Sequence, residues 1–565
     1  MRARDESQVD VTLNAVSGTH GVLLGFDVPG RRRRGLLGFA VERTLDGRTE
    51  WLPNFLRFAR NDRPDGPFGS NDNPLQAFQW GDYGVEPGQS VRYRAYAVRG
   101  RPGALRLSEN PAEVRIRTER ADDGRNGVYF NRGVAGSQAY TRRFGRSSPL
   151  GVPDARRWLS RGLEEGLLAF VARAQGAGWA LRGAFYEFYE PEVLGALKAA
   201  KMRGVDVRLV VSSPSDSAHW TEFPAADNAD AMRAQGSWAK RKPFIRLARA
   251  RTATDGIAHN KFLVLLEHGT PRAVWTGSTN ISPGALYGHS NLGHLSGDPH
   301  VAQAFLDYWQ QLDGDPETPA LQQWVDEHSP LPEIGHSPPL VPHGVSTVFS
   351  PHSDDAALDR YVQLMSRADQ AIFFTAPFGV TDRFEAELRV RRDIPRYLLL
   401  DKATNDMELA RADPNNSIAV GAYLGQPGGY RQFMQEYLTG LNSHVKFIHT
   451  KYLIVDPLTA NPVVVTGSAN FSPASTKDND ENMLVISGDT RVADIYLTEF
   501  MRLFTHLRFR GRVKVPRDQR APDPHEPEVK SRRHLHETDR WAKEYFDKGT
   551  PKARERLLFS DTPIA

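Results

Sequence analysis

Residues 259–280 read HNKFLVLLEHGTPRAVWTGSTN, and residues 449–470 read HTKYLIVDPLTANPVVVTGSAN. In both stretches a histidine, a lysine two residues later, a Gly-Ser pair and an asparagine keep the same spacing. A match of this length at two distant places predicts an internal duplication, in which one α/β unit occurs twice. Two imidazoles, two ammonium groups and two amides could then converge on one anion.

The segments before the two motifs support the duplication, because strands and helices follow one another in the same order. Before the first motif we predict strands at 128–131, 179–189 and 205–211 and helices at 153–175 and 191–203. Before the second we predict strands at 346–349, 371–375 and 397–400 and helices at 354–367 and 381–390. This alternation predicts sheets that are mostly parallel and covered on both faces.

The remaining sequence divides into three further parts. Residues 1–122 contain short apolar segments between turn residues, which predicts a β-sandwich, and the alternating stretch 87–98 resembles a late strand of fibronectin type III modules. The two α/β lobes are expected at 123–328 and 344–512, joined by a Pro-rich linker at 329–343. Residues 513–565 form a charged C-terminal arm, in which 538–559 is expected to pack back on the body.

Composition sets wider limits. The chain has 565 residues, 40% of them hydrophobic, and no cysteine, which excludes disulfides, thiolate metal sites and a catalytic thiol. A net charge of +4 is too balanced to argue for nucleic acid by itself, and we expect the run Arg31–Arg34 to be a solvated loop. The segment Met1–Asp10 lacks the features of a signal peptide and no apolar run is long enough for a transmembrane helix, so a cytoplasmic protein is expected.

The chemistry of the repeated motif suits a phosphodiester. Because side chains two apart on a strand share a face, His259 and Lys261 should project together, as should His449 and Lys451. The Gly-Ser turn adds backbone N–H groups, a hydroxyl and an asparagine amide. Apart from the histidines, which can exchange a proton, these groups are donors or cations, as the transition state of phosphoryl transfer requires. Neither a metal nor another cofactor is expected; in particular, the spacing of His289, His294 and His300 fits no standard zinc site.

Over residues 125–510 the chain resembles the phospholipase D superfamily, whose mark is His-x-Lys with an aspartate five residues after the lysine. The second copy has this aspartate, Asp456, whereas the first has Leu266 in its place, followed by Glu267. The resemblance implies two fused α/β lobes with one active site at their pseudo-twofold interface. It also implies a two-step reaction through a phosphohistidine.

The resemblance also implies individual roles. Lys261, Lys451, Asn280 and Asn470 would hold the phosphoryl oxygens, and Ser278 and Ser468 would support them. The family's downstream carboxylate falls on Glu481, and in the first half the matching position is Ser290. Our hypothesis is that His259 is the nucleophile, oriented by Glu481 across the lobe interface, and that His449 is the general acid.

Three functions remain open from the sequence. The first is hydrolysis or transphosphatidylation of a phospholipid, which would bring the chain into peripheral contact with a membrane. The second is a nuclease acting on DNA or RNA, favoured by the calculated isoelectric point near 9.0. The third is a non-catalytic phosphate-binding module. The internal pseudodimer removes the need for a second chain, so a monomer is expected.

Overall fold

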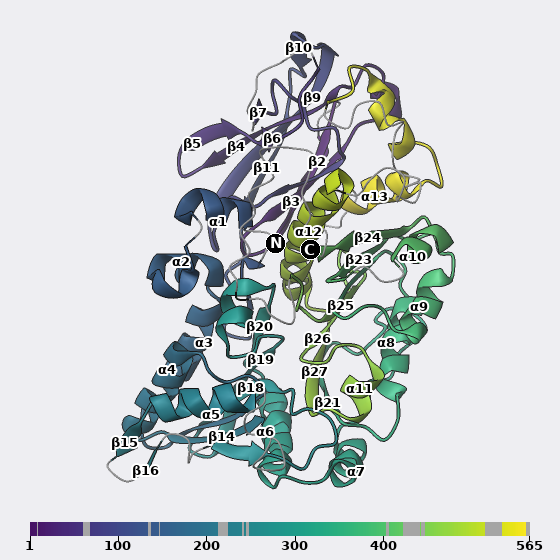
Figure 1. Cartoon of the computed structure of the whole chain (residues 1–565). Coiled ribbons are helices and arrows are strands. Elements are labelled where there is room, and N and C mark those ends of the chain that lie inside the picture. Colours follow the sequence, from purple (N-terminus) through teal and green to yellow (C-terminus); the bar gives the residue numbers. More distant parts are fainter. Residues whose placement is uncertain are drawn as a thin grey trace.

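In the computed structural model, two α/β lobes lie side by side below a β-rich N-terminal region (Figure 1). The structure describes residues 1–7, 10–59, 68–133, 137–145, 147–212, 224–239, 242–243, 248–402, 406–421, 441, 447–514 and 534–560. Among these residues, no helix has the length and apolar character needed to cross a membrane.

The N-terminal region has two larger antiparallel sheets around one core and a small sheet of β6 (Pro53–Asn54) and β7 (Phe68–Gly69). The first sheet has the order β1-β2-β3-β8, with bounds Arg2–Asp5, Thr12–Ser17, Val22–Asp27 and Gln79–Asp82. The second has the order β10-β9-β4-β5, with bounds Ala104–Leu107, Ser90–Arg101, Gly38–Leu45 and Arg48–Trp51, and β11 (Ala112–Arg117) also pairs with β9. Strand β9 alternates buried and partly exposed residues, as its sequence predicts.

The two lobes contain sheets of the same topology. Lobe 1 has the order β12-β20-β19-β18-β13-β14-β17, with bounds Asn126–Phe130, Leu292–Ser296, Thr270–Gly277, Lys261–Glu267, Trp179–Phe185, Asp206–Ser212 and Ala248–Arg251. Lobe 2 has the order β21-β27-β26-β25-β22-β23-β24, with bounds Gly344–Ser350, Glu481–Ser487, Val463–Gly467, Tyr452–Val455, Ile372–Ala376, Arg396–Leu400 and Asn416–Val420. The structure therefore contains the predicted duplication.

The prediction of a mostly parallel sheet was wrong. In lobe 1 only β13, β14 and β17 run parallel, and the other pairings, from β13 through β18, β19 and β20 to β12, are antiparallel. The reason is the short connection between β18 and β19, where His268 and Gly269 have φ of 48° and 80°. A tight turn of this kind joins antiparallel neighbours, whereas parallel neighbours need a long crossover.

Helices cover the sheets, and one of them differs from its prediction. The single helix expected at 153–175 is two helices, α2 (Pro153–Ser160) and α3 (Leu163–Ala172). Arg161 and Gly162 between them have φ of 50° and 93°, which ends the first helix. The other helices of lobe 1 are α1 (Ser137–Phe144), α4 (Pro191–Met202), α5 (Ala225–Ala234), α6 (Pro299–Asp313) and α7 (Thr318–His328). Lobe 2 has α8 (Ala356–Ser366), α9 (Asp382–Arg389), α10 (Asp406–Ala412), α11 (Pro473–Lys477) and α12 (Thr490–Lys514).

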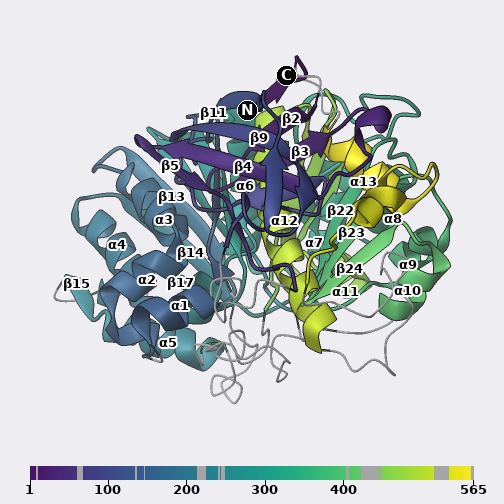
Figure 2. The same cartoon turned by 90° about the horizontal axis from the view of Figure 1, so that it is seen from above.

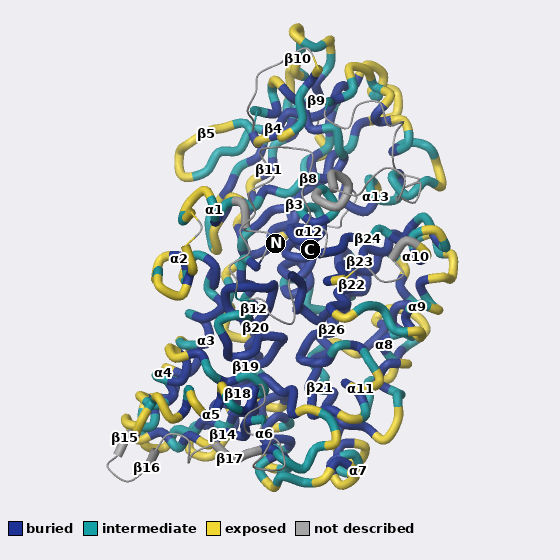
Figure 3. The backbone as a smooth tube through the Cα atoms, viewed as in Figure 1, coloured by how far each residue is buried: buried dark blue, intermediate teal, exposed yellow. Residues whose placement is uncertain are grey.

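Helices α6 and α12 join the lobes into one body. Each follows the last strand of its own lobe, packs on that lobe's sheet, and also contacts the first strand of the other lobe. Seen from above, the two lobes lie on either side of this pair (Figure 2). Their apolar residues belong to one cluster that includes strands of both sheets, and the tube view shows continuous burial there (Figure 3). A shared core of this kind holds the two motifs in a fixed relation.

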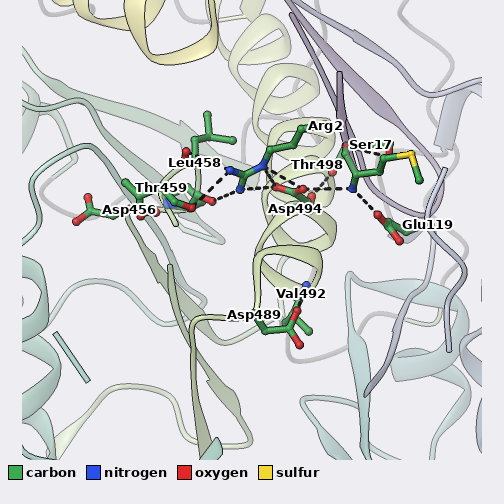
Figure 4. Close-up of polar contacts among 12 residues, drawn as sticks. Arg2, Ser17, Glu119, Asp456, Leu458, Thr459, Asp489, Val492, Asp494 and Thr498 are labelled. Atoms are coloured by element: carbon green, nitrogen blue, oxygen red, sulfur yellow. Dashed lines mark hydrogen bonds and ion pairs between the residues drawn. The ribbon is translucent and has the colours of Figure 1, made fainter. Parts of the chain in front are cut away.

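The chain termini tie the N-terminal region to this body. The guanidinium of Arg2 lies 2.9 Å from the carboxylate of Asp494 on α12, and both side chains are buried. The same guanidinium donates to the carbonyls of Pro457 and Leu458 in the turn after Asp456 (Figure 4). At the other end, the short helix η10 (Asp539–Tyr545) places Trp541 in the N-terminal core, and α13 (Pro551–Ser560) contacts β3.

Candidate active site

His259 lies two residues before the start of β18 and is held by a residue of the other lobe. Its Nδ1 is 2.8 and 2.9 Å from the two carboxylate oxygens of Glu481, the first residue of β27. Both side chains are buried. The contact expected across the interface is therefore present, and it leaves Nε2 of His259 for a ligand.

His449 lies three residues before β25 in the equivalent arrangement, but its partner is an amide. Its Nδ1 is 2.9 Å from Oδ1 of Asn291, which lies directly before β20 of lobe 1. Because the oxygen can only accept, His449 carries its proton on Nδ1 when it is neutral. The Ser278 hydroxyl donates to the same oxygen at 2.9 Å.

Asn291, not Ser290, is therefore the counterpart of Glu481, which corrects the sequence alignment by one residue. The backbone shows the same register: Ser290 N donates to Phe447 O and Asp480 N donates to Ile257 O, at 2.9 and 3.1 Å. The sequence held a signal for this position, because Asn291 follows Ser278 by 13 residues and Glu481 follows Ser468 by the same interval. The sequence prediction paired Asn291 with Asn482 instead, which placed Ser290 opposite Glu481.

The two motif lysines are buried beside the histidines. Lys451 Nζ donates to the carbonyl of His449 at 2.9 Å, and Lys261 Nζ donates to the carbonyl of His259. Each ammonium thus uses a donor on the backbone of its own motif and keeps others for an anion. The ring of Tyr186, which follows β13, packs edge-on against His259 at 5.1 Å and lies 5.5 Å from Lys261 Nζ. Sequence reasoning did not find Tyr186, since nothing in its local pattern distinguishes it from a core aromatic residue.

All four basic groups are buried, and their charges act on one another. Burial lowers the pKa of His259 to about 4, although Glu481 acts in the opposite direction, and burial lowers the pKa of Lys261 to about 7. Burial, followed by the charge of Lys451, holds the pKa of His449 well below its ordinary value, and burial together with Lys261 does the same for Lys451. Burial alone would raise the pKa of Glu481, but His259 keeps it below its ordinary value. Without a ligand, the site therefore favours neutral histidines, and a bound anion would stabilise the protonated forms of its basic groups.

The two asparagines of the Gly-Ser-x-Asn segments are placed for a ligand. Among the described residues, the amide oxygens of Asn280 and Asn470 accept no hydrogen bond although they are buried. Rotating either amide by 180° exchanges this oxygen for the Nδ2 donor, so both amides are available to a phosphoryl oxygen.

The two serines lie elsewhere than expected. The Ser278 hydroxyl accepts from Leu292 N while donating to Asn291, and Ser468 Oγ accepts from Asn482 N at 3.0 Å. The Ser278 hydroxyl contacts Asn291, which holds His449, and the Ser468 hydroxyl contacts the residue next to Glu481, which holds His259. The two hydroxyls support these residues instead of facing a phosphate.

Asp456 supports the scaffold at the far end of β25 from His449. Its carboxylate accepts from the backbone N–H groups of Asp369, Gln370 and Ala371, at 2.9, 2.6 and 3.0 Å. These residues lead directly into β22. In lobe 1, the corresponding Leu266 lies in the apolar core. The first motif therefore lacks only a scaffold contact and keeps the groups proposed to contact phosphate, His259, Lys261 and Asn280.

A buried ion pair crosses the interface beside Glu481. Arg251 Nε lies 2.8 Å from the carboxylate of Asp480, and Arg251 Nη1 lies 2.8 Å from Asp315. Sequence reasoning missed Arg251, because its partners are distant in the chain. In the part of the chain that the structure describes, no three histidine, aspartate or glutamate side chains are placed to hold a metal ion together.

Parts of the chain are similar to known proteins. The mitochondrial cardiolipin hydrolase of Xenopus laevis is 27% identical over 176 residues, which make up 31% of this chain and 73% of that protein. The structure of phosphatidylserine synthase from Haemophilus influenzae Rd KW20 is similar with a TM-score of 0.43 and 12% identity, over 70% of this chain and 93% of that one. Polyphosphate kinase from Porphyromonas gingivalis is similar with a TM-score of 0.37 and 12% identity, over 64% of this chain; the chain spans 44% of that kinase.

The family assignment comes from the sequence of both lobes. Residues 171–312 and 364–504 each match the family described as cardiolipin synthase, PLD-like domain, and together they amount to half of the chain. The matched segments contain both His-x-Lys motifs and both residues that hold the histidines. The chain therefore belongs to the phospholipase D superfamily of phosphodiesterases, with two PLD-like domains in a single polypeptide.

Proposed function

We propose that this chain cleaves phosphodiesters through a phosphohistidine without a metal ion, and that its substrate is a phospholipid. The observation that carries the proposal is the crossed support of the two histidines, Glu481 on His259 and Asn291 on His449. Each lobe thus completes the reactive group of the other. Both imidazoles keep Nε2 for the substrate beside two ammonium groups and two amides.

The unequal partners support one assignment of the roles. When Nε2 of His259 forms its bond to phosphorus, the imidazole becomes positively charged, and the carboxylate of Glu481 compensates that charge. His449 next to a neutral amide is a stronger acid, once protonated, than it would be next to a carboxylate. His259 is therefore the nucleophile and His449 the general acid.

The first step forms the covalent intermediate. The anionic substrate raises the pKa of His449, which takes up a proton on Nε2 from solvent. His259 Nε2 then bonds to phosphorus, the P–O bond to the leaving alcohol breaks, and that oxygen takes the proton from His449. Lys261, Lys451, Asn280 and Asn470 hold the non-bridging oxygens.

The second step releases the phosphoryl group. Water or an alcohol gives a proton to Nε2 of His449 while its oxygen bonds to phosphorus, and the P–N bond to His259 breaks. Water completes hydrolysis, and an alcohol completes transphosphatidylation. The same histidine serves as acid and then as base, as microscopic reversibility requires.

A lipid substrate is supported by apolar side chains near the motifs. Ile257, two residues before His259, is 39% exposed, and Phe378 is 53% exposed. Phe378 follows β22, where Thr375 donates to the carbonyl of Thr450 beside His449 at 2.8 Å. Exposed apolar side chains in segments next to the motifs suit an acyl-chain interface better than a polyanion. The name of the matched family, and that of the Xenopus relative, also point to cardiolipin chemistry.

The deciding experiment supplies labelled phospholipid vesicles and labelled DNA side by side, with EDTA present. We expect release of a head group and no DNA cleavage. Cleavage of DNA alone would replace the lipid substrate with a nucleic acid, and loss of all turnover in EDTA would refute the metal-free route.

Variants test the two roles. His259→Ala should abolish labelling of the protein by a phosphodiester with a p-nitrophenyl leaving group. His449→Ala should still form the labelled intermediate and release it slowly. His300→Ala, which changes an exposed histidine of α6, is the matched control. Near wild-type turnover in either motif variant would contradict the shared site.

The N-terminal region has a supporting part in this proposal. Two sheets around one core suit a fibronectin type III-like sandwich, and its anchoring to α12 suits a scaffold. A monomer is proposed as the active form, because both lobes of one chain complete the site. Sedimentation of the active protein tests this directly.

A further inference from the structure

The amide of Asn291 holds two imidazoles, and only one of them belongs to the repeated motif. Its Oδ1 contacts Nδ1 of His449 at 2.9 Å, and its Nδ2 lies 2.8 Å from Nδ1 of His289. The two rings are 4.8 Å apart between centroids, with an angle of 60° between their planes. His289 is buried, with an exposed fraction of 9%. The reaction described above makes no use of this third imidazole.

The hydrogen bonds of Asn291 determine the proton positions. Its Nδ2 has two hydrogens, which go to the Ala285 carbonyl at 2.9 Å and to His289. Its oxygen accepts from Ser278 and from His449. His289 Nδ1 is therefore an acceptor, so the neutral ring carries its proton on Nε2. If Nδ1 were protonated, two donors, this nitrogen and Asn291 Nδ2, would face each other. Burial together with Lys451 also lowers the pKa of His289 to about 3.

The position of His289 breaks the pseudo-twofold symmetry. The backbone register pairs Ser290 with Asp480, so the counterpart of His289 is Asn479. Asn479 turns its side-chain oxygen to the backbone N–H of Ile257 at 3.0 Å and is thus occupied. A neutral imidazole donor is therefore present beside His449 and has no equivalent beside His259.

We propose that His289 binds the substrate, donating a hydrogen bond from Nε2 to the oxygen that receives or gives up a proton at His449. This rests on the proposed function, in which His449 serves the leaving and entering oxygens. In the first step the leaving oxygen gains negative charge as the P–O bond breaks, and the His289 N–H stabilises it until the proton from His449 arrives. In the second step the same N–H orients the water or alcohol whose proton goes to His449. His289 remains neutral and keeps its own proton throughout.

Two substitutions of similar length separate the donor from the rest of the side chain. Glutamine in His289→Gln can accept from Asn291 and donate to the substrate. Methionine in His289→Met offers only a weak sulfur acceptor and no donor. Each variant is compared with wild-type protein on two phosphodiesters, one with an alkyl leaving group and one with a p-nitrophenyl leaving group, which departs without protonation.

We expect His289→Met to lower kcat roughly 100-fold for the alkyl substrate, the effect of removing one donor to a developing oxyanion. For the p-nitrophenyl substrate the formation of the labelled intermediate should change less than about 3-fold, because that oxygen needs little stabilisation. His289→Gln should retain most of the activity on both. Thermal unfolding midpoints of both variants verify that the fold is intact.

Two results would overturn this role. Equal losses on both substrates would mean that His289 acts only by orienting Asn291 and His449. Unchanged kcat of His289→Met on the alkyl substrate would mean that the donor is not used. If the wild-type protein turns over neither substrate, the proposed function itself fails, and this outcome is distinct from a difference between variants.

Discussion

Replacing Glu481 by glutamine tests the electrostatic basis of the proposed mechanism. The change Glu481→Gln keeps the size of the side chain and an acceptor for His259 Nδ1, but it removes a buried negative charge 2.8 Å from that nitrogen. In the proposed first step, His259 becomes cationic when it bonds to phosphorus. The variant therefore removes the charge that opposes this development while leaving the phosphate-binding groups in place.

The size of the effect follows from the distance. Two unit charges about 4 Å apart interact by about 4 kcal/mol at an effective dielectric constant near 20. The remaining hydrogen bond of the glutamine recovers about 1 kcal/mol of this. A net loss of about 3 kcal/mol in the transition state corresponds to a decrease in kcat of roughly 10²-fold.

The assay is the initial rate on a p-nitrophenyl phosphodiester, where formation of the intermediate is observed directly. The matched control is Glu267→Gln, since Glu267 ends β18 at the opposite end from His259 and its ion pair with Arg272 is at the surface. The control should keep its rate within a factor of about 2. A Glu481→Gln variant that is correctly folded and within 3-fold of wild type would refute the assignment of His259 as a nucleophile supported by charge.

Three further predictions concern protonation and stability. Binding of sulfate, which does not titrate near neutral pH, should take up protons at pH 7, because the anion raises the pKa of His449 and of the buried Lys261; titration calorimetry in two buffers with different ionisation enthalpies would show no difference if this is wrong. Arg2→Met should lower the free energy of unfolding by roughly 3–5 kcal/mol, because it leaves the buried Asp494 carboxylate without its guanidinium; a loss below about 1 kcal/mol in urea unfolding would contradict the buried ion pair. Burial lowers the pKa of His294 in the folded protein to about 3, below its ordinary value of 6.5. As the pH falls from 6.5 to about 3, the unfolded chain therefore binds a proton at His294 that the folded chain does not. The free energy of unfolding should fall over this range, with a slope of up to about 1.4 kcal/mol per pH unit. His294→Gln should reduce that slope and the exposed control His300→Gln should not, as measured by urea unfolding at several pH values.

Much of the site could be predicted because its chemistry is local in sequence. The two-residue period of a strand predicts that His259 lies with Lys261 and His449 with Lys451. The strands themselves begin only at Lys261 and Tyr452. The repeat of this spacing also predicts two lobes, and the structure contains them. Glu481 could be predicted only through the resemblance to a family, since the sequence places it far from His259.

The errors arose where neighbours in space are distant in the chain. The predicted strand directions were wrong because an apolar run does not show which strand it pairs with or in which direction. For β18 and β19, a two-residue turn makes the pairing antiparallel. The expected long helix ended at Arg161, because the backbone there adopts positive φ that no apolar periodicity reports.

By itself, the sequence determined which reactive groups this protein has, how they are spaced along each strand, and that they occur twice. Only the tertiary structure decided which group faces which, because the lobes pack through α6 and α12 and bring Glu481 to one histidine and Asn291 to the other. The difference between a carboxylate and an amide at equivalent positions makes two similar motifs chemically unequal. This difference affects the histidines only because the lobes pack against each other, and burial at their interface strengthens the effect of a single charge.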